Sequence, residues 1–143
     1  MKSTIKVLLV EDNEGDIELT TTLLEDSELR FNIDYVKNGK DAVSYIVERR
    51  SNISQLPHIV FLDINMPAMD GFEVLQHLVS YEILPPIAFF MLTSSQTKIE
   101  IDKAKELGAH GYFTKGCAFD VPTIAYHAAL IRYNRTKWIE SVS

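Results

Sequence analysis

Five apolar segments recur along the chain and have the length and composition of β-strands. They are residues 5–10 (IKVLLV), 31–36 (FNIDYV), 59–63 (IVFLD), 87–92 (IAFFML) and 111–114 (GYFT). The first, third and fourth are continuously apolar, which is typical of strands covered on both faces in a parallel sheet. The second alternates between apolar and polar residues, so we expect it at an edge of the sheet.

Segments with the 3.6-residue spacing of amphipathic helices separate these runs. We expect helices over residues 14–27, 39–50, 70–80, 96–108 and 120–137, each following one strand. The apolar face predicted for the last helix consists of Val121, Ala125, Ala128 and Ile131. Five repeats of a strand followed by a helix predict an α/β domain with three layers, in which right-handed crossovers join parallel strands.

The composition is that of one ordinary globular domain. The chain has 143 residues, of which 46% are apolar and 24% charged, enough to bury a core without cross-links. We interpret residues 1–143 as a single domain, with residues 138–143 as a short tail. A formal net charge of −6 disfavours binding to nucleic acids and membrane surfaces, which are also negatively charged.

Cysteine content and hydropathy favour a soluble cytoplasmic protein. Cys117 is the only cysteine, so no intramolecular disulfide can form, and we interpret it as a structural rather than a reactive thiol. No apolar run approaches the roughly 18 residues of a transmembrane helix. The first apolar run ends at once in an acidic cluster and has no small-residue cleavage site, unlike a signal peptide.

Polar side chains follow four of the five predicted strands at their carboxyl ends. These side chains are Glu11 and Asp12 after the first strand, Asp63 at the end of the third, Thr93 after the fourth and Lys115 after the fifth. Ligands of parallel α/β sheets bind outside the carboxyl ends of the strands. We therefore expect these side chains to share one rim of the sheet.

Three carboxylates at this rim would repel one another and need a cation. Two unit charges about 4 Å apart interact by roughly 4 kcal/mol at an effective dielectric constant near 20. A small number of hard oxygen ligands, with room for water, suits Mg²⁺. With Lys115 and Thr93 opposite, the rim could stabilise a transferring phosphoryl group. Asp63 could be the nucleophile, because carboxylates form aspartyl phosphates.

Each of these residues also has an ordinary structural interpretation. Asp12 or Asn13 could cap the helix that begins near residue 14, and Asp63 could cap the turn that follows it. Thr93 could stabilise the end of its strand, and Lys115 could be solvated. The occurrence of all of them at one rim, in the order acid pair, acid, hydroxyl and lysine, favours a common site.

Four motifs in this order resemble those of a known family. VLLVEDN, FLDINMPAMDGFEVL, MLTSS and GYFTKG look like the signatures of response-regulator receiver domains of two-component signalling. The resemblance runs over nearly the whole chain. It implies a flavodoxin-like (βα)5 fold, in which a parallel five-stranded sheet has the strand order 2-1-3-4-5.

The resemblance implies a role for each acidic residue of the rim. Asp63 matches the phosphoacceptor, which takes a phosphoryl group from a partner's phosphohistidine. Glu11 and Asp12 match the acidic pair that holds Mg²⁺, Asp12 directly and Glu11 mostly through water. The backbone carbonyl of Asn65 matches a further metal ligand.

A second group of residues matches those that transmit phosphorylation to the surface. Thr93 matches the switch hydroxyl that moves to bond the phosphoryl oxygen, and Lys115 matches the lysine that pairs with it. Tyr112 matches the aromatic whose rotamer reports phosphorylation, a role compatible with that of a half-buried strand aromatic. The chain departs from the family at Gly116, where a proline in a cis peptide is usual. A cis bond before another residue costs about 2.5–4 kcal/mol, which leaves the aim of Lys115 open.

We therefore interpret the chain as a stand-alone phosphorylation switch rather than an enzyme. A sensor histidine kinase or phosphotransfer protein would phosphorylate Asp63. The surface of the fourth helix, fifth strand and fifth helix would then bind a downstream protein or a second copy of the chain. The motifs also resemble those of small receiver-only regulators paired with phytochrome-type or other hybrid kinases.

Two rival functions can be weighed against this interpretation. A phosphatase with an aspartyl intermediate is disfavoured, because it needs a second acid two residues after the nucleophile and the chain has Asn65 there. The departure at Gly116 leaves a second rival function open. This rival is a receiver-like protein that acts by binding alone and is never phosphorylated.

Overall fold

A parallel five-stranded sheet forms the centre of the computed structural model, which describes residues 3–81, 84–95 and 97–142. Its strands are β1 (Ile5–Val10), β2 (Phe31–Val36), β3 (Ile59–Asp63), β4 (Ala88–Thr93) and β5 (Gly111–Thr114). They lie in the order β2-β1-β3-β4-β5, so the predicted fold class and strand order are confirmed. β2 is an edge strand, as its alternating pattern predicts.

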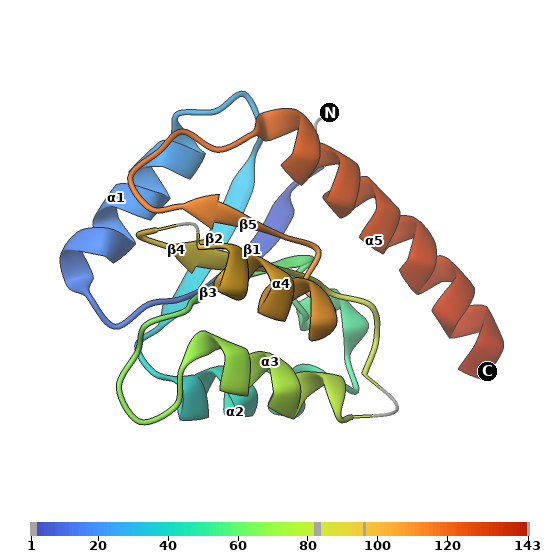
Figure 1. Cartoon of the computed structure of the whole chain (residues 1–143). Coiled ribbons are helices and arrows are strands. Elements are labelled where there is room, and N and C mark those ends of the chain that lie inside the picture. Colours follow the sequence, from blue (N-terminus) through green and yellow to red (C-terminus); the bar gives the residue numbers. More distant parts are fainter. Residues whose placement is uncertain (1–2, 82–83, 96, 143) are drawn as a thin grey trace.

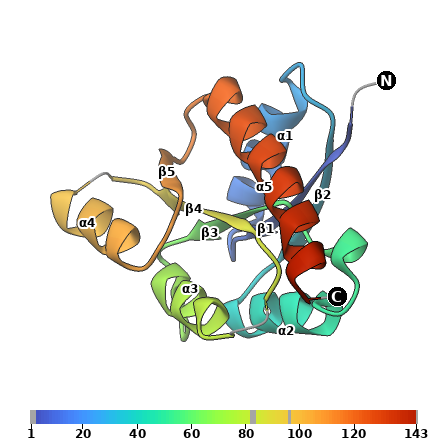
Figure 2. The same cartoon turned by 90° about the vertical axis from the view of Figure 1, so that its right-hand side faces the viewer.

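Helices cover both faces of the sheet. They are α1 (Glu14–Glu25), α2 (Gly39–Arg49), α3 (Gly71–Val79), α4 (Lys98–Glu106) and α5 (Val121–Val142), with a short 3-10 helix at Ile53–Gln55. α1 and α5 lie on one side of the sheet, and α2 and α3 lie on the other (Figures 1 and 2). No helix in the described part of the chain is long and apolar enough to cross a membrane.

The core consists of two apolar clusters separated by the sheet. Alternate residues of β3 serve the two clusters, because successive strand side chains point to opposite faces. Phe61 packs in the cluster that includes Leu24 of α1 and Ala128 of α5. Leu62 packs in the cluster that includes Ile46 of α2 and residues of α3 and α4. The continuously apolar strands are therefore buried on both faces, as expected for a parallel sheet.

Two predictions about the last helix are corrected. α5 continues to Val142, so residues 138–142 extend the helix instead of forming a tail. Its buried residues are Ile124, Ala128, Ile131 and Arg135. Ala128 and Ile131 are buried as predicted, whereas Val121 and Ala125 are only partly buried. A search for apolar spacing cannot find Arg135, because the residue is charged. Residue 143 and the predicted start of the fourth helix at residue 96 lie outside the described residues.

Cys117 is exposed in the loop after β5. The interpretation of this residue as a structural thiol is therefore wrong. Whether a cysteine is buried depends on where its loop lies in the fold, and the sequence around a single cysteine does not show this.

Arg135 connects α5 to the segments that lead into β3 and β4. Its side chain is only 7% exposed. The guanidinium donates hydrogen bonds to the carbonyl oxygens of Pro86, at 2.9 Å, and of Pro57, and it approaches that of Leu56 at 3.5 Å. Buried carbonyl groups need such partners, and here one planar cation supplies several donors.

His58 lies next to this arginine, directly before β3. Its Nδ1 accepts a hydrogen bond from the backbone N–H of Lys6 at 2.9 Å, which requires a ring nitrogen without a proton. Burial lowers the pKa of His58 to about 4, and the positive charges of Arg135, Arg132 and Lys6 lower it further. The imidazole is therefore neutral in the folded protein at neutral pH.

Stability is expected to fall as the pH drops from 6.5 to about 4. The unfolded chain protonates His58 near its ordinary pKa of 6.5, whereas the folded protein does so only near 4. The unfolded state thus binds more protons in this range, so the free energy of unfolding decreases with falling pH. The loss should be about 2 kcal/mol, allowing for partial solvent access to the ring. Denaturant unfolding should show that the free energy of unfolding depends less steeply on pH in His58→Asn than in the wild type. Identical slopes in the two proteins would show that His58 is not the source of the pH dependence.

Candidate functional site

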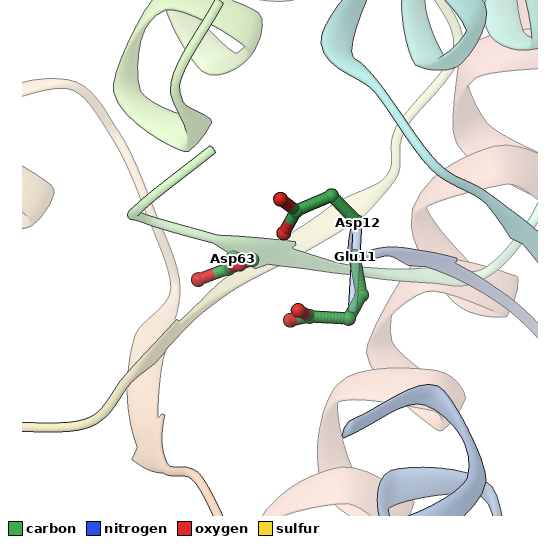
Figure 3. Close-up of side chains that lie close together, drawn as sticks. All are labelled: Glu11, Asp12 and Asp63. Atoms are coloured by element: carbon green, nitrogen blue, oxygen red, sulfur yellow. The ribbon is translucent and has the colours of Figure 1, made fainter. Parts of the chain in front are cut away.

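Three carboxylates gather where β1 and β3 end. Val10 pairs with Leu62 in the sheet register, so Glu11 and Asp63 follow at the same level of the rim. Figure 3 shows their carboxylates beside that of Asp12 at the ends of these strands. One ligand atom from each of the three lies within 4.8 Å of the others. Glu11 and Asp63 are each 1% exposed, whereas Asp12 is exposed, so the cluster reaches solvent on the Asp12 side.

The first turn of α1 decides between the two roles considered for Asp12. The side chain of Asn13 accepts the N–H of Asp16 at 2.9 Å and is the N-cap of α1. The backbone N–H of Asn13 in turn donates to Glu11 Oε1 at 3.2 Å. Asn13 therefore caps the helix, and Asp12 lies in the carboxylate cluster.

Gly71 lets α3 begin directly against the end of β3. A Cβ atom at this position would lie 2.4 Å from the backbone oxygen of Asp63, far inside van der Waals contact. Asp70 caps the helix in a capping box with Glu73, which fixes where the helix begins. The absence of a side chain at Gly71 thus sets how closely α3 approaches the strand that carries Asp63.

Lys115 places its ammonium among the carboxylates. The residue follows β5, and its backbone N–H donates to the carbonyl of Thr93 at 2.8 Å. Its Nζ lies 2.9 Å from Glu11 Oε2, 3.1 Å from Asp63 Oδ1 and 3.2 Å from Asp16 Oδ2. With a side chain only 15% exposed, Lys115 is part of the site, and its interpretation as a solvated lysine is wrong.

Burial and charge oppose each other in this cluster. Burial raises the pKa of Glu11 to about 7; the Lys115 ammonium counteracts this, and the Asp63 charge adds to it. Burial alone would lower the pKa of Lys115, but the contacts and charges of Glu11 and Asp63 outweigh it and raise that pKa. The ammonium is therefore firmly protonated, but one cation faces several carboxylates.

The remaining oxygens of the cluster suit a divalent cation. Asp63 Oδ1 accepts the N–H of Asn65 at 3.1 Å, whereas Asp63 Oδ2 is buried and has no hydrogen-bond partner among the described residues. Glu11 Oε2 meets Lys115 as an ion pair, without the geometry of a hydrogen bond. Buried carboxylate oxygens without a hydrogen-bond partner are costly, and a hard cation held with Asp12 would offset this cost by neutralising part of the negative charge of the cluster.

Thr93 lies at the rim, but its hydroxyl is turned toward its own loop. The hydroxyl donates to the carbonyl oxygen of Ser95 and accepts the Ser95 N–H at 3.1 Å. The side chain is 2% exposed, at the end of β4. A contact between this hydroxyl and a group on Asp63 would therefore require the loop bonds to break.

Tyr112 lies half-buried on β5, beside Met91 of β4. With Thr93 and Ile101 of α4 it lines a small cavity of about 10 Å³. Tyr112 and Thr93 thus border the same space, which Ile101 and Ala104 of α4 also line.

The loop after Lys115 differs from the cis-proline pattern of the resembled family. No cis peptide occurs among the described residues, so the Lys115–Gly116 bond is trans. Gly116 has φ +79°, in the left-handed region that favours glycine. The glycine allows this path, and the trans bond does not prevent Lys115 from reaching Glu11 and Asp63.

Two residues that shape the site, Asp16 and Gly71, were not predicted from the sequence. Asp16 contacts Lys115. In the sequence Asp16 is simply an acid in the first turn of a helix, and the helix dipole favours an acid there whether or not it contacts a lysine. Gly71 falls within the helix expected over residues 70–80, but its close approach to Asp63 depends on a distance between two elements. The structure brings Glu11, Asp12, Asp63 and Lys115 together and places Thr93, Asn65 and Tyr112 around them.

Comparisons with known proteins agree with this geometry. The family model for the response regulator receiver domain matches residues 7–124. The chain is similar to the probable methanogenesis regulatory protein FilR2 of Methanothrix harundinacea, with 30% identity over 114 residues that cover 80% of this chain and 74% of that protein.

Similar proteins also include a longer enzyme and a solved regulator. A protein-glutamate methylesterase/protein-glutamine glutaminase of Caldanaerobacter subterraneus is 35% identical over 115 residues, 80% of this chain, but the chain spans only 29% of that protein. The solved bacteriophytochrome response regulator AtBRR is 32% identical, with a TM-score of 0.70 over 90% of this chain and 92% of that one. With the family match over most of its length, the chain belongs to the response regulator receiver domains.

Proposed function

We propose that the chain is a phosphorylation switch whose phosphoacceptor is Asp63. One observation supports this most strongly: Asp63 Oδ2 is buried without a hydrogen-bond partner among the described residues, beside two further carboxylates and the Lys115 ammonium. A carboxylate oxygen in this position keeps its lone pairs available for attack on phosphorus. The nearby ammonium can pair with an incoming phosphoryl oxygen.

The phosphoryl donor is the phosphohistidine of a sensor histidine kinase or a phosphotransfer protein. Asp63 Oδ2 attacks the phosphorus, and an O–P bond forms while the P–N bond to the donor breaks. The electron pair of that bond leaves with the imidazole, which takes up a proton. The similarity to AtBRR, named as a bacteriophytochrome response regulator, supports a phytochrome-type kinase as the donor.

Mg²⁺ is the cation that we propose for the carboxylate cluster. Glu11, Asp12, Asp63 and the backbone carbonyl of Asn65 would hold it, a set of hard oxygen ligands. When bound, Mg²⁺ neutralises charge on the transferring phosphoryl group. Lys115 then holds the phosphoryl oxygens from the opposite side.

Phosphorylation is read out at the α4-β5-α5 surface. The phosphoryl group adds roughly two negative charges at Asp63, which attract the Thr93 hydroxyl away from Ser95. Movement of Thr93 changes the cavity that it shares with Tyr112 and thereby the packing of α4. Ile99 of α4 and Tyr126 of α5 are exposed and would contact a downstream protein or a second copy of the chain.

The chain acts in the cytoplasm as a phosphorylation switch and not as an enzyme. Apart from slow self-catalysed phosphotransfer and dephosphorylation, no reaction is expected of it. The side chain of Asn65, exposed two residues after Asp63, cannot serve as the general acid that a phosphatase of the aspartyl type would need. The net charge of −6 supports a protein partner rather than nucleic acid or a membrane.

Incubation with Mg²⁺ and acetyl phosphate tests the proposal by intact mass. The wild type should gain one phosphoryl group, while Asp63→Asn and the chelator-treated wild type should gain none. Asp102→Asn, which removes an exposed aspartate of α4, is the matched control and should be modified as the wild type is. No adduct with any donor would instead favour a binding-only protein, and rapid turnover of phosphate esters would favour an enzyme.

A further inference from the structure

Asp16 is a carboxylate partner of Lys115 that lies outside the candidate metal cluster. Its Oδ2 accepts a hydrogen bond from Lys115 Nζ at 3.2 Å. The contact joins the first turn of α1 to the residue after β5, which are 99 positions apart in the chain. Glu11 and Asp63, the other two partners of the ammonium, both belong to the metal cluster.

The hydrogen bonds at the start of α1 leave the Asp16 carboxylate free for this contact. An acidic residue at the third helical position commonly bonds back to the N–H of the N-cap residue in a capping box. Here the N-cap is Asn13, and its N–H is already bound to Glu11 Oε1. The Asp16 backbone is fixed by its bond to the Asn13 side chain, so its carboxylate extends from a rigid turn toward Lys115.

Lys115 needs an anchor outside the metal cluster, because its other two partners, Glu11 and Asp63, are candidate ligands of the cation. A lysine has a flexible four-carbon stem and ends in a compact charge, so its position follows from its partners. The next residue is Gly116, at φ +79°, which adds no side chain to confine the stem. When a cation shares the charge of Glu11 and Asp63, their hold on the ammonium weakens, and Asp16 is the partner that keeps its full charge.

We propose that Asp16 is a positioning residue for the phosphorylation of Asp63: it holds Lys115 Nζ where the ammonium meets an incoming phosphoryl oxygen. The inference rests on the proposed function. Asp16 itself touches neither the phosphoryl group nor the cation, and it acts through Lys115. Its removal allows the ammonium to leave its place beside Asp63 Oδ1, from which it assists the transfer.

The rate of phosphorylation by acetyl phosphate at saturating Mg²⁺ tests this role. Asp16→Ala should lower the rate about tenfold, because a displaced catalytic group loses much of its effect. Asp16→Asn keeps an oxygen acceptor in the same place and should lower it less. The matched control is Glu18→Gln, which removes an exposed acidic charge from the same helix and should leave the rate unchanged.

A double variant separates positioning through Lys115 from other effects. In a Lys115→Met background, Asp16→Ala should cause no further loss of rate, since the group that it positions is gone. A further tenfold loss there, or a rate for Asp16→Ala equal to that of Glu18→Gln, would overturn the proposal. Thermal unfolding of Asp16→Asn and Asp16→Ala establishes that both are folded.

A measurement without metal or phosphodonor keeps this inference distinct from the proposed function. The ¹⁵N–¹H signal of Lys115 Nζ should be visible in the wild type and in Glu18→Gln, and it should broaden through faster hydrogen exchange in Asp16→Ala. An unchanged signal in Asp16→Ala refutes the anchoring contact even if Asp63 is phosphorylated. A changed signal in a protein that no donor phosphorylates refutes the switch but retains the contact.

Discussion

A Gly71→Ala variant is expected to lose about 3 kcal/mol of its free energy of unfolding and most of its reaction with acetyl phosphate. The added Cβ would lie 2.4 Å from the backbone oxygen of Asp63 and 3.0 Å from Cε of Met91. The methionine can move aside, but the carbonyl belongs to a central strand that is buried along its whole length. Either α3 moves away or the end of β3 turns, and both displace the Asp63 carboxylate. Denaturant unfolding and intact mass measure the two losses.

Gly15→Ala is the matched control for this variant. Gly15 also lies in the first turn of a helix beside the carboxylate cluster, but its Cβ would meet only the side-chain oxygen of Asn13, at 3.2 Å. A side chain can adjust by a few tenths of an ångström, and alanine favours the helix, so the change should stay within about 1 kcal/mol. Equal stability of the two variants would show that α3 does not need its close approach to β3.

The fold was predictable because its central strands obey a simple rule. A strand covered on both faces contains almost no polar residue until it ends, and β3 follows this pattern from Ile59 to the first charged residue, Asp63. The same rule located the site, since the polar residues that end parallel strands must share one rim. Glu11 and Lys115 lie 104 positions apart in the sequence, yet their charged groups are 2.9 Å apart.

The residues that escaped prediction depend on competition between several partners. Asp16 contacts Lys115 because Glu11 has already taken the N–H to which an acid at that position would otherwise bond. In sequence, Arg135 belongs to a basic cluster with Arg132 and Lys137, as at many helix ends. Only the arrangement of the loops before β3 and β4 shows that three carbonyl groups converge on Arg135, which makes this arginine part of the buried face of α5.

Arg135→Met is expected to lower the free energy of unfolding by about 3 kcal/mol. Methionine fills much of the same volume but leaves the carbonyl oxygens of Pro86, Pro57 and Leu56 without their donor, and hydrogen bonds to charged groups contribute about 1.5–3 kcal/mol each. Water has partial access to these carbonyl groups, so the loss of stability should be smaller than the sum of the three hydrogen-bond contributions. Arg135→Lys should lose less, because an ammonium retains the charge but cannot reach all three oxygens in the plane of a guanidinium.

Arg132 provides a control for the Arg135→Met variant, and His58 provides a second measurement. Arg132→Met removes a more exposed guanidinium that donates to the carbonyl of Thr4 at 2.8 Å, and it should cost less than about 1 kcal/mol. Burial is the main cause of the low pKa of His58, and the charge of Arg135 is the next. The pKa of His58 should therefore rise from about 4 toward its ordinary value of 6.5 in Arg135→Met, as followed by an NMR titration of the ring. Equal stabilities of Arg132→Met and Arg135→Met would contradict the connecting role of Arg135, because of these two arginines it is Arg135 that donates to the segments leading into β3 and β4.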